Sequence, residues 1–129
     1  MANKYILLKD LEVYVLARKL SKAAYKIFQN MTWEHKKAFG FQFLEATDSI
    51  GANIAEGYHR FHYLDKIKFY YNARASLSES KDHWMDLLHE RGLVDKSDFE
   101  KYVEISNALS VKLNNLIRSN YIQRQKTIT

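Results

Sequence analysis

The stretch DLEVYVLARKLSKAAYKIFQNM, residues 10–31, decides the fold class. Its apolar residues recur in alternating steps of three and four, which places them on one face of an α-helix. These residues are Val13, Leu16, Leu20, Ala23, Ile27 and Met31. The opposite face carries charged residues, namely Glu12, Lys19, Lys22 and Lys26. A helix with a single apolar stripe must bury it against other elements, so this segment predicts a helix that packs in a helical domain.

Two further segments repeat this pattern. We predict that a second helix begins at Thr32, whose hydroxyl can cap free amide groups. It should end near residue 56, because Gly57 can adopt the left-handed conformation that closes a helix. A third helix is expected over residues 65–91, with Gly92 as its closing residue.

A fourth helix completes the set. Asp95 or Ser97 should cap it, and its apolar stripe ends near residue 119. The chain has no proline and four glycines, so turns are few and helices are long. The predicted fold class is all-α, an antiparallel up-down-up-down four-helix bundle over residues 1–119, followed by a basic, frayed tail over residues 120–129.

The composition excludes several classes of protein. The 129 residues are 47% hydrophobic and 27% charged, as in an ordinary folded domain. Cysteine is absent, which excludes disulfides, thiolate zinc sites and a cysteine nucleophile. No run approaches the roughly 20 apolar residues of a membrane span, and no secretion signal is apparent. We therefore expect a cytoplasmic protein without a membrane partner.

The sequence offers little for catalysis. Its five histidines fit no metal-binding signature, and it has neither a glycine-rich phosphate loop nor a nucleophile elbow. We therefore predict no enzyme, no catalytic or metal-binding residues and no cofactor. An active site built on Asn53, Glu56 and Arg74 is a further alternative, but it lacks an identifiable nucleophile and base.

Polar residues follow one face of the second helix beside its apolar stripe, and the third helix offers complementary groups. The set comprises Ser49, Asn53, Glu56, Arg74, Ser76 and Glu79. We interpret it as a structural hydrogen-bond network between the two helices, with Glu56 paired to Arg74, because buried polar groups need partners. The alternative is a groove that binds a ligand or nucleic acid.

The net charge is +5, and the excess lies at the two ends of the chain. Residues 1–30 have six basic and two acidic residues, and residues 93–129 have six and four. If the first and last helices are neighbours, these charges form one phosphate-binding surface, with Tyr121 able to stack on a base. The candidate nucleic-acid-binding residues are Arg18, Lys19, Lys22, Lys26, Arg118, Arg124 and Lys126. The alternative is an ordinary solvated surface.

Three stretches share their order and spacing with a known family. The run QFLEATDSIGANIAEG, residues 42–57, resembles the signature of the 23S rRNA intervening-sequence protein family, and Asn53 to Gly57 is its most specific part. Residues 10–14 and 73–79 agree as well, so the resemblance spans residues 8–94. It implies a four-helix bundle that assembles as a ring-like homopentamer and has no established enzymatic activity.

The sequence also departs from that pattern. Leu44 and Glu45 stand where the family usually has two arginines, and Gly51 stands where it usually has proline. The resemblance extends to the accessory variability protein of diversity-generating retroelements, a basic pentamer that binds nucleic acid and a reverse transcriptase.

Two functions follow from these observations. The first is a non-enzymatic homo-oligomer, by resemblance a pentamer, that binds RNA or DNA and has a reverse transcriptase as a partner. The alternative is a protein-interaction scaffold without nucleic-acid binding. Aromatic residues beyond the apolar stripes favour an oligomer in both cases. These are Tyr14, Tyr25, Phe28, Tyr70 and Tyr71.

Overall fold

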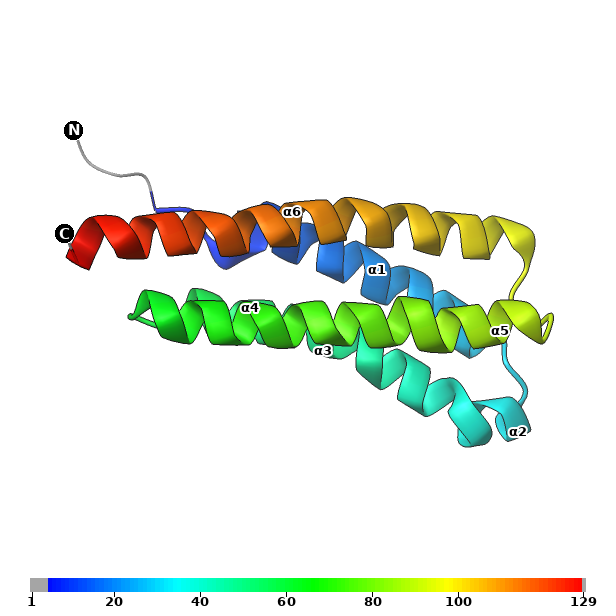
Figure 1. Ribbon diagram of the computed structural model, residues 1–129. Helices are drawn as coiled ribbons and strands as arrows, with labels where there is room; N and C mark the ends of the chain where they lie inside the picture. The colour runs from blue at the N-terminus through cyan, green and yellow to red at the C-terminus, as the bar shows by residue number, and fades with distance from the viewer. Residues whose placement is uncertain (1–4, 129) are drawn as a thin grey trace.

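The computed structural model describes residues 5–128, and these residues form helices and short connections without strands (Figure 1). In chain order the elements are η1 (Leu8–Asp10), α1 (Glu12–Gln29), α2 (Trp33–His35), η2 (Lys36–Gly40), α3 (Phe41–Tyr58), α4 (Tyr63–Ser78), η3 (Glu79–Met85), α5 (Asp86–Glu90) and α6 (Lys96–Ile128). The segments η2 and η3 are π-helical and continue into their neighbours. The chain therefore forms four long helical rods.

The rods pack as the predicted antiparallel four-helix bundle (Figure 1). Helix α1 lies between α3 and α6, and α4 contacts the same two helices from the other side. Two ion pairs show the antiparallel register of α1 and α6. Glu12 Oε1 lies 3.1 Å from Lys112 Nζ, and Lys26 Nζ lies 3.2 Å from Asp98 Oδ1.

The predicted apolar stripes form the core. Along α1 and the residues after it, Val13, Leu20, Ala23, Ile27 and Met31 are buried. The interpretation of the extra aromatic residues needs correction, because Phe28 and Tyr70 are core residues rather than surface residues. Burial raises the pKa of the Tyr70 hydroxyl. Tyr25 and Tyr71 stay exposed as expected, and Tyr14 is half-buried.

Three predicted helix ends are confirmed. Thr32 Oγ1 accepts a 3.2 Å hydrogen bond from the backbone N–H of His35, and Asp95 Oδ1 accepts one of 2.8 Å from Asp98. Gly92 has a φ of +68°, and the residue after it, Leu93, donates to the carbonyl of Leu88 at 2.9 Å. This is a Schellman motif, which satisfies the last carbonyls of α5.

The predicted role of Gly57 is wrong. It is a helical residue, and α3 continues through it to Tyr58. Gly57 lies where α3 passes closest to α4: a Cβ atom here would be 2.9 Å from Phe69 Cβ and 3.1 Å from the carbonyl oxygen of Lys66. The glycine is needed for a close approach between two helices, which a local sequence pattern does not reveal.

The expected end of the last helix at residue 119 is also wrong. Helix α6 continues to Ile128, so residues 120–128 are helical rather than frayed. Asn120 is buried and donates to the carbonyl of Leu116 at 2.8 Å, and Tyr121 contacts Tyr71 of α4. Contacts with α4 thus extend the bundle beyond the apolar stripe.

A buried hydroxyl pair crosses the core. Thr47 Oγ1 lies 2.7 Å from the Tyr102 hydroxyl and also donates to the carbonyl of Phe43 at 3.1 Å. Both residues are fully buried, and burial raises the pKa of Tyr102 to about 12. The pair joins α3 to α6 and keeps the Tyr102 side chain in a fixed position.

Candidate nucleic-acid interface

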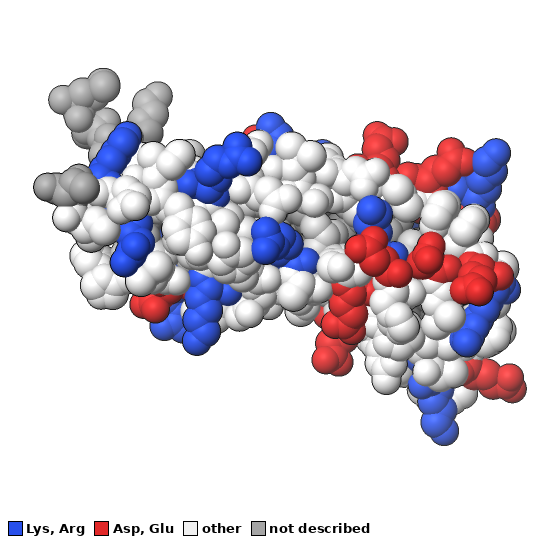
Figure 2. All heavy atoms as spheres, viewed as in Figure 1, with Lys and Arg blue, Asp and Glu red and all other residues white. Residues whose placement is uncertain are grey.

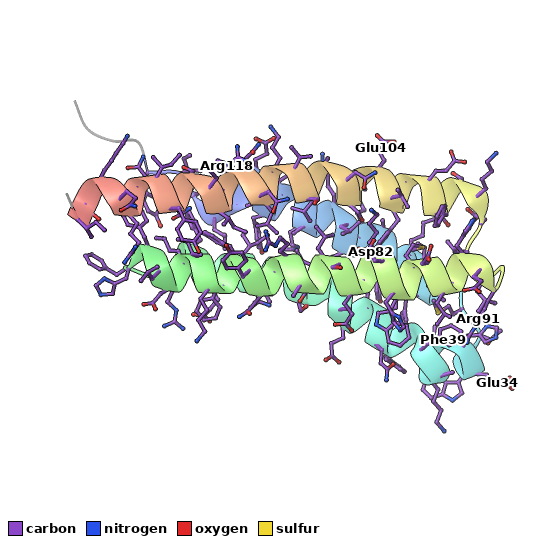
Figure 3. The ribbon with its side chains drawn as sticks, viewed as in Figure 1. Glu34, Phe39, Asp82, Arg91, Glu104 and Arg118 are labelled. Atoms are coloured by element: carbon purple, nitrogen blue, oxygen red, sulfur yellow. The ribbon has the colours of Figure 1, made fainter. Side chains whose placement is uncertain are left out.

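On the face shown in Figure 2, acidic side chains gather toward one end of the bundle, whereas basic side chains occur along its whole length. Residues 105–128, the C-terminal part of α6, include four basic and no acidic residues. Residues 79–104, which lie toward the other end, include eight acidic and four basic residues. Arg118 and Glu104 accordingly lie on opposite halves of α6 (Figure 3). The half of the bundle where α6 ends therefore has a positive potential, which attracts polyanions.

Three of the four basic candidates of α1 lie together in a groove between α1 and α3. Arg18, Lys19 and Lys22 line it, joined by Lys9, and its volume is about 910 Å³. Asp48 of α3 is its acidic member. We name Lys9, Arg18, Lys19 and Lys22 the α1 patch. Four cations around one groove can contact several phosphates at once.

The fourth candidate, Lys26, faces a different neighbour. Its ammonium group is paired with Asp98 of α6, whose carboxylate side chain is only 12% exposed. The Lys26 side chain is 67% exposed, so it retains access to solvent while it helps to hold α1 against α6. Lys26 is thus a register contact between helices as well as a surface charge.

The remaining basic candidates lie toward the end of α6. Arg118, Arg124 and Lys126 follow one another toward the end of α6, and we name them the α6 patch. The two α1–α6 ion pairs place Lys19 level with residue 105 of α6. Arg118 is therefore roughly 20 Å farther along the axis, at about 1.5 Å per residue. Lys19 and Arg118 are thus offset along the bundle, and the single basic surface expected from the sequence stays a prediction.

A cluster of tyrosine and arginine side chains adjoins the α6 patch. The hydroxyls of Tyr71 and Tyr121 are 3.3 Å apart, and the Arg74 guanidinium lies 4.6 Å from the centre of the Tyr71 ring. The hydrogen bond with Tyr71 raises the pKa of Tyr121, whereas the positive charges of Arg124 and Arg74 act to lower it. Sequence reasoning found Tyr121 but missed its partners on α4.

The sequence of most of the bundle matches a known family. The family model described as 23S rRNA-intervening sequence protein matches residues 9–115. The chain belongs to the 23S rRNA-intervening sequence protein family. A solved structure from the S23 ribosomal protein family of Bacteroides thetaiotaomicron VPI-5482, a protein with unknown function, has a TM-score of 0.77 to this chain. It is 22% identical and covers 85% of this chain and 98% of its own, which supports the shared fold. No curated protein matches the chain.

Only one of the two basic patches lies within the residues that match the 23S rRNA-intervening sequence protein family. The α1 patch lies within the matched residues, whereas all three residues of the α6 patch lie beyond residue 115. Tyr121 is beyond it too. The family resemblance read from residues 42–57 is confirmed, and the link to the accessory variability protein stays a prediction.

One hydrogen bond of the predicted polar network joins α3 to α4. Ser49 donates to Ser76 of α4 at 2.6 Å, as the structural interpretation requires. Asn53 and Glu79 bond within their own rods. Asn53 Nδ2 donates to the carbonyl of Ser49 at 2.9 Å, and Glu79 accepts a 3.1 Å hydrogen bond from Trp84 Nε1.

The predicted pair of Glu56 and Arg74 does not form. Glu56 is exposed and pairs with Arg60 one turn later, at 2.9 Å. Arg74 faces α6 instead, where Nη1 donates to Asn114 Oδ1 at 3.1 Å. The prediction was wrong because residue 74 lies on the side of α4 that contacts α6, not on the side that contacts α3. The six network residues thus form no single site.

Residues 5–128 contain neither a cluster of metal-binding side chains nor a membrane-spanning helix. Within that range, no three histidine, aspartate or glutamate side chains gather closely enough to hold a metal ion. None of the helices in the same range combines the length and the apolar character needed to cross a membrane.

Proposed function

We propose that this member of the 23S rRNA-intervening sequence protein family is a non-enzymatic, homo-oligomeric protein that binds RNA or DNA through its basic patches. The observation that carries the proposal is the charge of α6 from residue 105 to 128, where four basic residues occur without an acidic one. Phosphate contacts by lysine and arginine supply most of the affinity of sequence-independent binding. The α1 patch adds four cations around one groove.

Two further considerations support this function. The name of the family connects its members with 23S rRNA, so RNA is the first ligand to test. An oligomer repeats both patches on each subunit, and linked weak contacts bind far more tightly than single ones. By resemblance we propose five subunits and a reverse transcriptase as a protein partner, and from the composition we propose a cytoplasmic location.

The test is a titration of labelled RNA and DNA with the protein at about 50 and 200 mM salt. We expect binding at the lower salt that weakens by orders of magnitude at the higher, because each neutralised phosphate releases counterions. Replacing Arg118, Arg124 and Lys126 by glutamate should abolish it. The matched control replaces three lysines of the acidic half by glutamate, namely Lys37, Lys96 and Lys101. This control changes the net charge equally and should weaken binding less.

Failure of that test favours the second function, a protein-interaction scaffold. Its specific support is an aromatic surface at the other end of the bundle, where Tyr25, Trp33 and Phe41 are 52%, 67% and 48% exposed. The rings of Trp33 and Phe41 meet edge to face with centroids 6.1 Å apart. If micromolar protein binds neither nucleic acid at the lower salt, the scaffold function replaces nucleic-acid binding.

Both functions require an oligomer, and light scattering measures it. We expect a particle of several subunits at tens of micromolar protein. A monomer under these conditions contradicts the proposed assembly and removes the gain from repeated patches.

A further inference from the structure

The sequence contains the pattern Tyr-x-x-Arg twice, in YNAR at residues 71–74 and in YIQR at residues 121–124. Residues three apart share one face of a helix, so each tyrosine lies beside its own arginine. Helices α4 and α6 are antiparallel neighbours, and they bring the two patterns together through the 3.3 Å contact of the tyrosine hydroxyls. The bundle thus concentrates two aromatic rings and two guanidinium groups at one place.

These rings are accessible to solvent. Tyr71 is 37% exposed and Tyr121 is 40% exposed, and their ring planes are inclined at 60° with centroids 6.5 Å apart. Large aromatic side chains at a surface offer flat, apolar faces that water solvates poorly. The cluster therefore presents surface on which another flat apolar group can stack.

The arginine of α4 is held in a defined position. The Arg74 guanidinium lies over the Tyr71 ring, and its Nη1 donates to Asn114 Oδ1 at 3.1 Å. A guanidinium has five N–H donors in a planar fork, and this bond uses one of them. An arginine fixed in this way suits a phosphate, which binds the fork of a guanidinium through two oxygens.

A groove continues the cluster toward the end of the bundle. Arg124 lines it together with Phe61, and its volume is about 690 Å³. The Phe61 side chain is 88% exposed, the highest exposure of any large hydrophobic residue described. Arg124 belongs to both the cluster and the groove, so the two surfaces adjoin; the groove lining also includes Lys66 and Asp65.

We propose that Tyr71, Arg74, Tyr121 and Arg124, with Phe61 in the adjoining groove, form a binding site for single-stranded nucleic acid. Unpaired bases stack on the aromatic rings, and the phosphates between them contact the two arginines. The proposal rests on the proposed function and specifies its ligand. A duplex does not satisfy this site, because the faces of its bases are already stacked on one another.

The alternative is a purely structural role for the cluster, and the experiment must distinguish that role from ligand binding. The contact between the hydroxyls of Tyr71 and Tyr121 could serve only to join α4 to α6. Tyr121→Phe removes the hydroxyl and keeps the ring, whereas Tyr121→Leu removes both and keeps an apolar side chain of helical propensity. If the site binds by stacking, Tyr121→Phe keeps binding and Tyr121→Leu loses it. If only the hydroxyl contact matters, both variants lose the same contact.

The experiment measures the affinity of the full chain for three labelled probes at about 50 mM salt. They are an oligouridine of about 12 nucleotides, an abasic strand with the same number of phosphates, and a hairpin duplex. We expect the oligouridine to bind at least about tenfold more tightly than the abasic strand, because stacking contributes at that level for each base. Tyr121→Leu should remove this preference, and Tyr121→Phe should keep it.

The outcomes separate the two proposals. Equal binding of oligouridine and abasic strand overturns the stacking site while the phosphate-binding function stands. Equal loss of the preference in Tyr121→Phe and Tyr121→Leu overturns it as well, in favour of the hydroxyl contact. If no probe binds the unaltered protein, both proposals fail. The comparison of probes on the unaltered chain is independent of whether a variant folds.

Discussion

Replacing Gly57 by alanine tests the close approach of α3 and α4. The new Cβ would lie 2.9 Å from Phe69 Cβ, 2.9 Å from Tyr70 Cε1 and 3.1 Å from the Lys66 carbonyl oxygen. The first and last of these atoms belong to, or are fixed by, the backbone of α4. A side-chain rotation cannot relieve these contacts, so the two helices must move apart.

The expected free-energy change has two parts. Overpacking of a well-packed contact costs about 1 to 3 kcal/mol, and fixed backbone atoms place this case near the upper value. Alanine is a better helix former than glycine by about 1 kcal/mol, which offsets part of that cost. We therefore expect Gly57→Ala to lower the free energy of unfolding by about 1 to 2 kcal/mol.

Gly51 of the same helix provides the matched control. A Cβ there would lie 3.7 Å from Ala17 Cβ and 3.8 Å from Tyr14 Cε1, which are ordinary contact distances. Gly51→Ala should therefore raise the free energy of unfolding by up to about 1 kcal/mol through helix propensity alone. Urea unfolding followed by circular dichroism, at one protein concentration for both variants, measures the difference. If Gly57→Ala is as stable as Gly51→Ala, our explanation of Gly57 is refuted.

Substitutions at three further residues have expected outcomes in the same unfolding assay. Gly92→Ala should lower the free energy of unfolding by about 1 kcal/mol because the φ of residue 92 is positive, and Gly92→Asn should lower it less. Equal stability of the two variants and the unaltered protein would contradict the Schellman motif. Tyr102→Phe should cost about 0.5 to 1.5 kcal/mol by removing the bond to Thr47. The pKa of Tyr102 is about 12 in the folded chain and 10.0 ordinarily, so stability should fall between these pH values, and less steeply in Tyr102→Phe. Arg74→Ala should cost less than about 1 kcal/mol, since its bond to Asn114 is exposed; a larger loss would mean that the contact is essential to the fold.

The helices could be predicted from the sequence because their apolar residues repeat with the period of a helix. Val13, Leu20 and Ile27 show this directly, and Thr32 and Gly92 mark boundaries by local chemistry that needs no tertiary contact. Local sequence rules fail where a tertiary contact determines which residue is needed. Gly57 resembles a helix-closing residue, yet it is selected here by the distance between two helices.

The candidate interface was only partly predictable for a related reason. Counting charges along the chain identified the basic ends, but it could not show that residues 105–128 and residues 79–104 occupy different halves of the bundle. It also could not place Arg74 toward α6 rather than α3, because a shift of one or two residues moves a side chain to another face of a helix, as Ser76 shows by contacting α3. The pairing of Tyr71 with Tyr121 joins positions 50 apart, and no local pattern relates them.

The separation of charge along the bundle also affects how the protein approaches a partner. With net positive charge toward one end and net negative charge toward the other, the molecule has an electric dipole moment directed along its length. In the field of a polyanion it experiences a torque, which turns its basic end forward before any contact is made. Such orientation raises the rate of association and weakens as the Debye length shortens with added salt. The slope of the association rate constant against ionic strength therefore reports the dipole independently of the equilibrium affinity.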